Sequence, residues 1–172
     1  MDNENSMVAK VQYAEIVTQA LSRRGRTVVR VFGRSMYPTL KNGMRVEVQP
    51  VEYDELRVGD IVVFNSGNGI ICHRLLKKSN RLCHLKGDTN LHSDHPVIWA
   101  QVIGKVTRIV DDNWRIFQLD TLSFRRKGAL LARFSYLYAL YYNLLHFAGR
   151  CSWWSRGIEW VDSSIPEKLR MK

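Results

Sequence analysis

Ser35 stands where a serine hydroxyl could act as a nucleophile. It lies in the segment GRSMYPTL (33–40), between a β-branched run and the turn residues KNG. Pro38 restricts the backbone just beyond the serine, and Gly33 leaves room for another backbone to approach on the other side. A serine in such a turn is most often structural, so the nucleophilic interpretation depends on the rest of the chain.

A serine hydroxyl needs a base to attack a carbonyl at neutral pH, and the five histidines are the first candidates. His73 lies in the strand-like segment GIICHRLL, where it could equally be a hydrogen-bonded side chain on a half-buried strand. Asp88 and Asp94 lie in the turn-rich stretch LKGDTNLHSDHP, where carboxylates are ordinarily solvated or cap turns. Spacing alone leaves both interpretations open.

Metal binding is a second chemistry that the same stretch could support, because mixed sets of histidine, cysteine and carboxylate bind zinc. The candidate ligands are Cys83, His84, His92, Asp94 and His95. Their spacing is irregular and no CxxC or HExxH pattern appears. We therefore predict no metal site and no other cofactor.

The cysteines indicate a reducing environment. Cys72, Cys83 and Cys151 occur in a chain whose first residues, MDNENSMVAK, lack the basic start and apolar run of a secretory signal. We expect reduced thiols. A disulfide between Cys72 and Cys83 across a hairpin is the less favoured alternative.

Three segments must position these residues. Residues 7–22 have helical spacing, and Arg23-Arg24-Gly25 indicates the end of that helix. Its predicted apolar side holds Tyr13, Ile16, Val17, Ala20 and Leu21. From Thr27 to about Leu119, short β-branched runs alternate with turn residues, which is typical of an antiparallel β fold: TVVRVF, MRVEVQPV, DIVVF, GIICHRLL, RLCHLKG, QVIGKVTRIV and NWRIFQL. We predict a helical segment 1–26, a β domain 27–120 and a helical tail 121–172.

The tail concentrates the positive charge of the chain. The whole chain carries +10, and residues 121–172 supply +6 of it, together with 10 of the 18 aromatic residues, Trp153, Trp154 and Trp160 among them. Residues 128–149 are predicted to form a helix whose apolar face holds Leu130, Phe134, Leu137, Tyr138, Tyr141, Leu144 and Leu145, opposite Ser135, Tyr136, Asn143 and His146. We expect this helix to lie in a membrane interface or on the core and not to span a bilayer, because Arg133, Asn143 and His146 oppose insertion.

Several motifs together resemble type I signal peptidases: SMYPTL, VGDIVVF, ICHRLL, LKGDTNLHSD and VIGKV, in this order within residues 28–110. His73 followed by Arg74 is similar to the archaeal and endoplasmic-reticulum type, which pairs serine with histidine instead of lysine. The resemblance implies a mainly β fold and a serine endopeptidase that cleaves a signal or leader peptide after small residues. It also implies Ser35 as nucleophile, His73 as general base, Asp94 as its partner, Asp88 in a supporting role and the Ser35 backbone N–H as oxyanion donor.

Two departures from that family shape the remaining expectations. Gly33 stands where many bacterial members have a hydroxyl that assists the oxyanion, and the family's hydrophobic anchor does not appear before residue 27. We therefore expect the basic tail to attach the protein to an anionic membrane surface, with a soluble cytoplasmic protein as the alternative. The predicted partner is a peptide or protein precursor, and the oligomeric state is left open.

Two other functions fit parts of the sequence. The SMxPT turn and β fold also resemble self-cleaving repressors of the SOS type, and the basic charge would suit DNA. Those proteins have lysine at the position of His73 and a multi-helix DNA-reading domain, whereas a single helix fits before Thr27. No nucleic-acid partner is therefore predicted. A non-enzymatic membrane-binding module, with the serine turn as a relic, is the other alternative.

Overall fold

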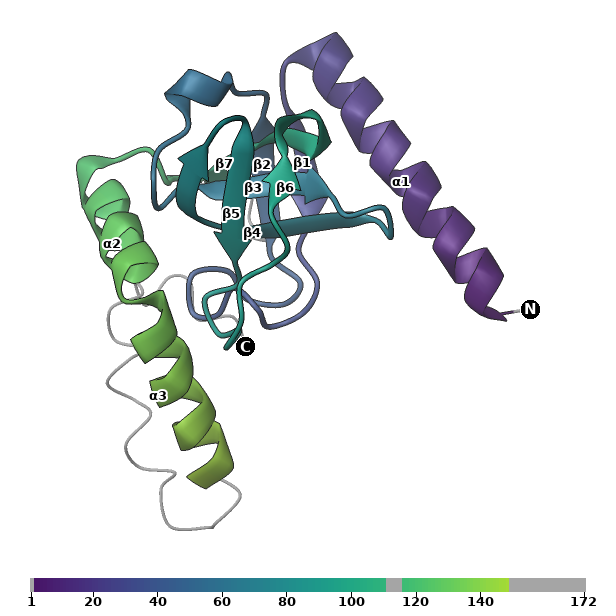
Figure 1. Cartoon of the computed structure of the whole chain (residues 1–172). Helices are drawn as coiled ribbons and strands as arrows, with labels where there is room; N and C mark the ends of the chain where they lie inside the picture. The colour runs from purple at the N-terminus through teal and green to yellow at the C-terminus, as the bar shows by residue number, and fades with distance from the viewer. Residues whose placement is uncertain (1, 111–115, 149–172) are drawn as a thin grey trace.

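The computed structural model describes residues 2–110 and 116–148. A curled antiparallel sheet forms a half-barrel, with one helix before it and two after it, as Figure 1 shows. The predicted mainly β fold with flanking helices is confirmed. The elements in chain order are α1 (Asp2–Arg24), β1 (Thr27–Arg30), β2 (Arg45–Gln49), η1 (Tyr53–Glu55), β3 (Ile61–Asn65), β4 (Ile70–Ser79), β5 (Leu82–Lys86), β6 (Val97–Ile98), η2 (Trp99–Gln101), β7 (Val102–Val110), β8 (Ile116–Gln118), α2 (Leu122–Arg133) and α3 (Ser135–Ala148).

The strands lie in the order β1-β2-β7-β3-β4-β5-β6, with β8 paired to β7. All pairs are antiparallel, as the absence of long crossover segments predicted. Only part of β4 is paired on both sides: β3 pairs with residues 70–74, whereas pairing with β5 begins at Arg74. The first half of β4 and the strand β1 therefore each leave one backbone edge open within the described sheet.

Two apolar clusters hold the sheet together, one on each face of β3. Ile61 and Val63 belong to the first cluster, which extends to α1, while Val62 and Phe64 belong to the second cluster. Because both faces are covered, β3 has no polar alternation, and this explains the continuous apolar run IVVF. The strand is therefore buried on both faces, and its residue Val62 is paired with His73 of β4.

Helix α1 is longer than predicted and packs through a narrower strip. It ends where expected, with the Gly25 N–H donating to the Leu21 carbonyl at 2.8 Å. Ala14, Val17 and Leu21 are buried, at a spacing of three and four residues. Tyr13 and Ile16, which we expected on the packed side, are 43% and 62% exposed. The small side chain of Ala14 lets the helix approach the sheet closely. A pattern of hydrophobic residues alone therefore predicts the wrong packed face for this helix.

The predicted helix 128–149 is two helices that meet at Phe134, and the first begins earlier, at Leu122. Its packing face also differs from the prediction. The buried residues are the small ones, Gly128, Ala132, Ser135 and Ala139, whereas the predicted apolar face is largely solvent-exposed. Packing through small residues lets the helix backbone approach closely: an ideal Cβ on Gly59 would lie 2.5 Å from the backbone of Gly128 and Ala129. Nothing larger than glycine fits at this contact.

Smaller differences concern short elements and the cysteines. Strand β6 has two residues and was not predicted, and β8 retains only the last part of NWRIFQL, since residues 111–115 lie outside the description. Cys72 and Cys83 are free thiols, in line with the favoured expectation. Cys151 and the tryptophans Trp153, Trp154 and Trp160 lie outside the described residues. Among the helices described, none is both long and apolar enough to cross a bilayer.

Candidate active site

Ser35, His73 and Asp94 lie in one continuous row of contacts. The Ser35 hydroxyl oxygen lies 3.1 Å from His73 Nε2, and His73 Nδ1 lies 2.6 Å from a carboxylate oxygen of Asp94. His73 is 6% exposed, so water reaches the ring poorly. With its proton on Nδ1 the ring donates to Asp94, and Nε2 can then accept from the Ser35 hydroxyl. This is the geometry that a hydroxyl nucleophile and its base require.

The Ser35 turn is fixed by the loop that follows β5. Thr89 donates from its backbone N–H to the Ser35 carbonyl at 2.9 Å, and its hydroxyl donates to the Arg34 carbonyl at 3.0 Å. An ideal Cβ on Gly87 would lie 2.8 Å from the Ser35 Cβ, which real Cβ atoms essentially never show. A side chain at position 87 would therefore displace the serine. The same loop places Asp94, whose N–H donates to the Leu85 carbonyl at 2.9 Å.

Arg74 and Asp88 form a buried ion pair behind the histidine. The guanidinium Nε and Nη2 each donate to one carboxylate oxygen of Asp88 at 2.7 Å, and Arg74 and Asp88 are 3% and 2% exposed. Thr39, four residues after Ser35, accepts from Arg74 Nη2 and donates to Asp88, both at 2.8 Å. The bidentate pair thus connects the strand that carries His73 to the turn that carries Ser35. Removing one partner would leave the other buried and uncompensated.

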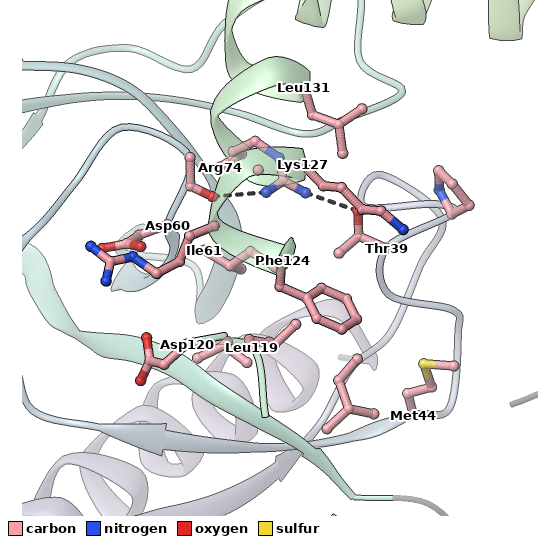
Figure 2. A pocket seen from close by; sticks show the side chains of 16 residues that line it. Thr39, Met44, Asp60, Ile61, Arg74, Leu119, Asp120, Phe124, Lys127 and Leu131 are labelled. Carbon is pink, nitrogen blue, oxygen red and sulfur yellow. Dashed lines mark hydrogen bonds between the residues drawn. The ribbon is translucent and has the colours of Figure 1, made fainter. Parts of the chain in front are cut away.

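Arg74 also joins the site to α2. Its Nη1 donates to the Gly59 carbonyl at 2.8 Å, at the point where Gly59 contacts Gly128. Figure 2 shows Arg74, its bond to Thr39 and the neighbouring Lys127 and Leu131 of α2, around a cavity of about 150 Å³. Neither Ser35 nor His73 lines this cavity, so it lies on the supporting side of the site.

Ser35 and His73 line a separate groove of about 680 Å³. Its remaining wall comes from α1, from β1 and the residues just after it, from one residue of β3, and from the β3–β4 hairpin with the start of β4: Ala9, Lys10, Tyr13, Val29, Arg30, Val31, Phe32, Val63, Asn68, Gly69, Ile70, Ile71 and Cys72. Most of these side chains are apolar. The groove therefore offers a largely apolar surface that includes the Ser35 hydroxyl and the His73 imidazole.

The Ser35 backbone N–H, expected as the oxyanion donor, has no acceptor in the part of the chain that the structure describes. The Ser35 carbonyl, in contrast, is bonded to Thr89. Gly33 has φ +93°, a conformation that side-chain-bearing residues rarely adopt, and its N–H is bonded to the Asn42 side chain at 2.9 Å. Backbone conformation, and not lack of space, thus disfavours a hydroxyl residue at position 33.

Burial shifts the pKa values of two other reactive side chains near the site, Cys72 and Lys86. Burial, and to a lesser extent the Asp88 charge, raise the pKa of the Cys72 thiol to about 11, so this groove-lining thiol stays protonated at neutral pH. Burial lowers the pKa of Lys86, although Asp88 and Asp94 oppose the shift. The Lys86 ammonium donates to the carbonyls of Gly87 and Ser135, at 3.3 and 2.9 Å. It therefore connects the Gly87 loop to the start of α3.

Helix α3 completes the support of the serine turn. The Asn143 amide donates to the Thr89 carbonyl at 3.0 Å, and the ring of Tyr142 lies 5.7 Å from that of Tyr37. These roles of Asn143, Lys86 and Thr39 were not predicted, and no role was predicted for Arg74. For Arg74, its position beside His73 was the available signal, whereas nothing in the sequence indicates that a lysine donates to a helix carbonyl.

The candidate metal ligands are not brought together. Cys83 is fully buried in the second apolar cluster, whereas His92 and His95 are exposed on the loop beyond. Across residues 2–110 and 116–148, no group of three or more histidine, cysteine or acidic residues is arranged to hold a metal ion.

A family model described as Peptidase S24-like matches residues 3–107. The match covers nearly all of α1, strands β1 to β6, the first part of β7, and each of Ser35, His73, Asp88 and Asp94. A comparison with curated protein sequences gives no match.

Proposed function

Since the chain belongs to the Peptidase S24-like family, we propose that it is a serine endopeptidase of the signal peptidase I type that cleaves a peptide precursor after small residues. The family includes signal peptidases and self-cleaving regulators. The observation that carries the choice of residues is the row of contacts from Ser35 through His73 to Asp94. Ser35 is the nucleophile in this proposal, His73 the general base and Asp94 the partner that orients the imidazole.

In the acylation half of the reaction, one proton moves twice. As Ser35 Oγ attacks the scissile carbonyl, His73 Nε2 takes the hydroxyl proton, and it then returns this proton to the leaving amine when the C–N bond breaks. Water attacks the resulting ester by the same route and frees Ser35. Asp94 stabilises the imidazolium in both steps. The Ser35 N–H donates to the oxyanion, and a donor of this kind typically lowers the barrier by about 3 kcal/mol.

The groove supports an extended peptide as substrate. Strand β1 and the first half of β4 both line it, and both have an unpaired backbone edge in the described sheet. Extended peptides bind to such edges through main-chain hydrogen bonds, while alternate side chains enter pockets. Val31, Val63 and Cys72 line the groove together with Ser35 and His73 and offer apolar surface for the small side chains that we propose beside the scissile bond.

Incubation of the purified chain with peptides that carry A-x-A before a defined bond, followed by mass spectrometry, tests the proposal. We expect a cut after the second alanine in trans. A cut within the chain itself, at a first-order rate that does not depend on protein concentration, would instead identify a self-cleaving regulator. Intact peptides and an intact chain at every pH from about 6 to 9 would contradict both functions.

We further propose that the exposed face of α2 and α3 attaches the protein to an anionic membrane. Eight large apolar side chains of this face are 49–71% exposed: Leu122, Leu130, Phe134, Tyr136, Leu137, Leu140, Tyr141 and Leu144. Residues 121–148 contain Arg125, Arg126, Lys127 and Arg133 and no acidic residue. Cations beside an apolar helix face are typical of helices that lie in the headgroup region of anionic bilayers.

Flotation with lipid vesicles tests this attachment. We expect most of the protein to float with vesicles containing anionic lipid at low salt and little to float with neutral vesicles. The double substitution Leu137→Gln and Leu144→Gln should abolish most of the bound fraction, because it removes apolar surface without touching the packed face. Ile98→Gln, which changes a side chain of similar exposure on β6, is the matched control. Equal flotation of the double variant and the unmodified protein would rule out this face.

A further inference from the structure

Helix α1 forms one wall of the groove that contains Ser35 and His73. Ala9, Lys10 and Tyr13 line the groove, and the buried residues of the helix, among those whose burial is described, begin at Ala14. The Lys10 stem lies against the β3–β4 hairpin: an ideal Cβ on Gly69 would lie 3.2 Å from the Lys10 Cβ. Figure 1 shows this hairpin reaching toward α1. A peptide in the groove must therefore pass the side chains of the helix.

The charged side chains that line the groove are positive. Two residues that line the groove carry a permanent charge, Lys10 and Arg30, and no aspartate or glutamate lines it. Over the described ranges, neither Lys10 nor Arg30 forms an ion pair. Asp94, the nearest carboxylate of the site, is already engaged by His73. Positive charges along a concave, largely apolar surface concentrate a positive electrostatic potential within the groove.

We propose that the groove selects acidic peptides, with Lys10 and Arg30 as specificity-determining residues. The substrate class is a peptide that has small residues at the scissile bond and a carboxylate side chain at the position that reaches the α1 wall. The inference rests on the proposed peptidase function, which it deepens. Electrostatic selection of this kind acts on the association rate and on KM more than on kcat, because the cations lie away from the reacting atoms.

The test uses a series of peptides that differ in the position and sign of one charged residue. In twelve-residue peptides with A-x-A before the bond, glutamate, glutamine or lysine is placed in turn at each other position, and kcat/KM is measured. We expect a glutamate preference of about tenfold over lysine, confined to one or two neighbouring positions and weakened by salt. Lys10→Glu should remove or invert the preference there. Lys77→Glu, an exposed lysine of β4 outside the groove, should leave it unchanged.

Binding of the same labelled peptides to the Ser35→Ala protein separates the two proposals. A glutamate preference in binding that Lys10→Glu removes would uphold the selection even if the unmodified protein cleaved nothing, which would refute the peptidase. Cleavage at equal rates for all three residues at every position would refute the selection alone. A preference that Lys77→Glu reduces as much as Lys10→Glu would assign it to the net charge of the chain and overturn the role of Lys10. Absence of both binding and cleavage would overturn both proposals.

Discussion

Replacing Ser35 by alanine is expected to lower kcat/KM for peptide cleavage by roughly 10⁴- to 10⁶-fold, and His73→Ala should have an effect of the same order. The substitution of Ser35 removes the only oxygen that Nε2 of His73 contacts in the described structure. The double variant should be scarcely worse than either single variant, because neither residue functions in this reaction without the other.

Thr39→Ser and Cys72→Ser are the controls for this comparison. Thr39→Ser keeps the hydroxyl that accepts from Arg74, and Cys72→Ser removes the groove thiol whose raised pKa keeps it protonated. Both should retain activity within about tenfold. If Ser35→Ala retained activity while Cys72→Ser lost it, the nucleophile would be the thiol and the assignment of Ser35 would be wrong.

Asp94→Asn should lower kcat by about 10²- to 10⁴-fold with little change in KM. The amide of asparagine can donate to Nδ1 at the 2.6 Å contact, and the ring proton then moves to Nε2. The Ser35 hydroxyl would then face an N–H that cannot accept its proton. The fold should persist, because the Arg74–Asp88 pair that connects the turn to β4 does not involve Asp94.

Asp54→Asn, on the exposed 3-10 helix η1, is the matched control for this substitution and should leave both constants unchanged. The measurement is steady-state kinetics on one A-x-A peptide, together with thermal unfolding of each variant. An Asp94→Asn enzyme within tenfold of the unmodified kcat would show that the carboxylate does not orient the base.

The sheet could be predicted because most of its strands are long enough to carry a local pattern. The run IVVF and the alternation of GIICHRLL are visible without any tertiary information. Strand β6 could not be predicted, since two residues carry no period and its pairing depends on β5. The length of α1 was underestimated because its polar first turns, DNENS, carry no apolar spacing.

The packing of the C-terminal helices shows why hydrophobicity alone misplaces a helix face. The sequence favours burial of Leu137 and Leu144, yet Ala132 and Ala139 are the residues against the body. Small side chains permit the close approach at Gly59 and Gly128, and Lys86 donates to the Ser135 carbonyl beside the break at Phe134. These contacts join segments that are far apart in the sequence, so no local pattern contains them.

In the candidate site, too, the residues that belong to local motifs could be predicted, whereas contacts between distant segments could not. Motif order was sufficient to nominate Ser35, His73 and Asp94, and the structure brings these three side chains into contact; their catalytic roles remain predictions. The support behind them could not be read from the sequence, because Thr39 and Arg74 are 35 residues apart and meet only in the fold. The contribution of α1 to the groove was missed for the same reason.

Trapping of the acyl-enzyme tests the central claim most directly. The protein is mixed with an activated ester of a short peptide that ends in A-x-A, quenched in acid within seconds, digested and examined by mass spectrometry. We expect the mass of the acyl peptide on the fragment that contains Ser35, with no adduct in Ser35→Ala and a much slower adduct in His73→Ala. Turnover of the ester with the adduct on another residue, or turnover undiminished in Ser35→Ala, would contradict the account.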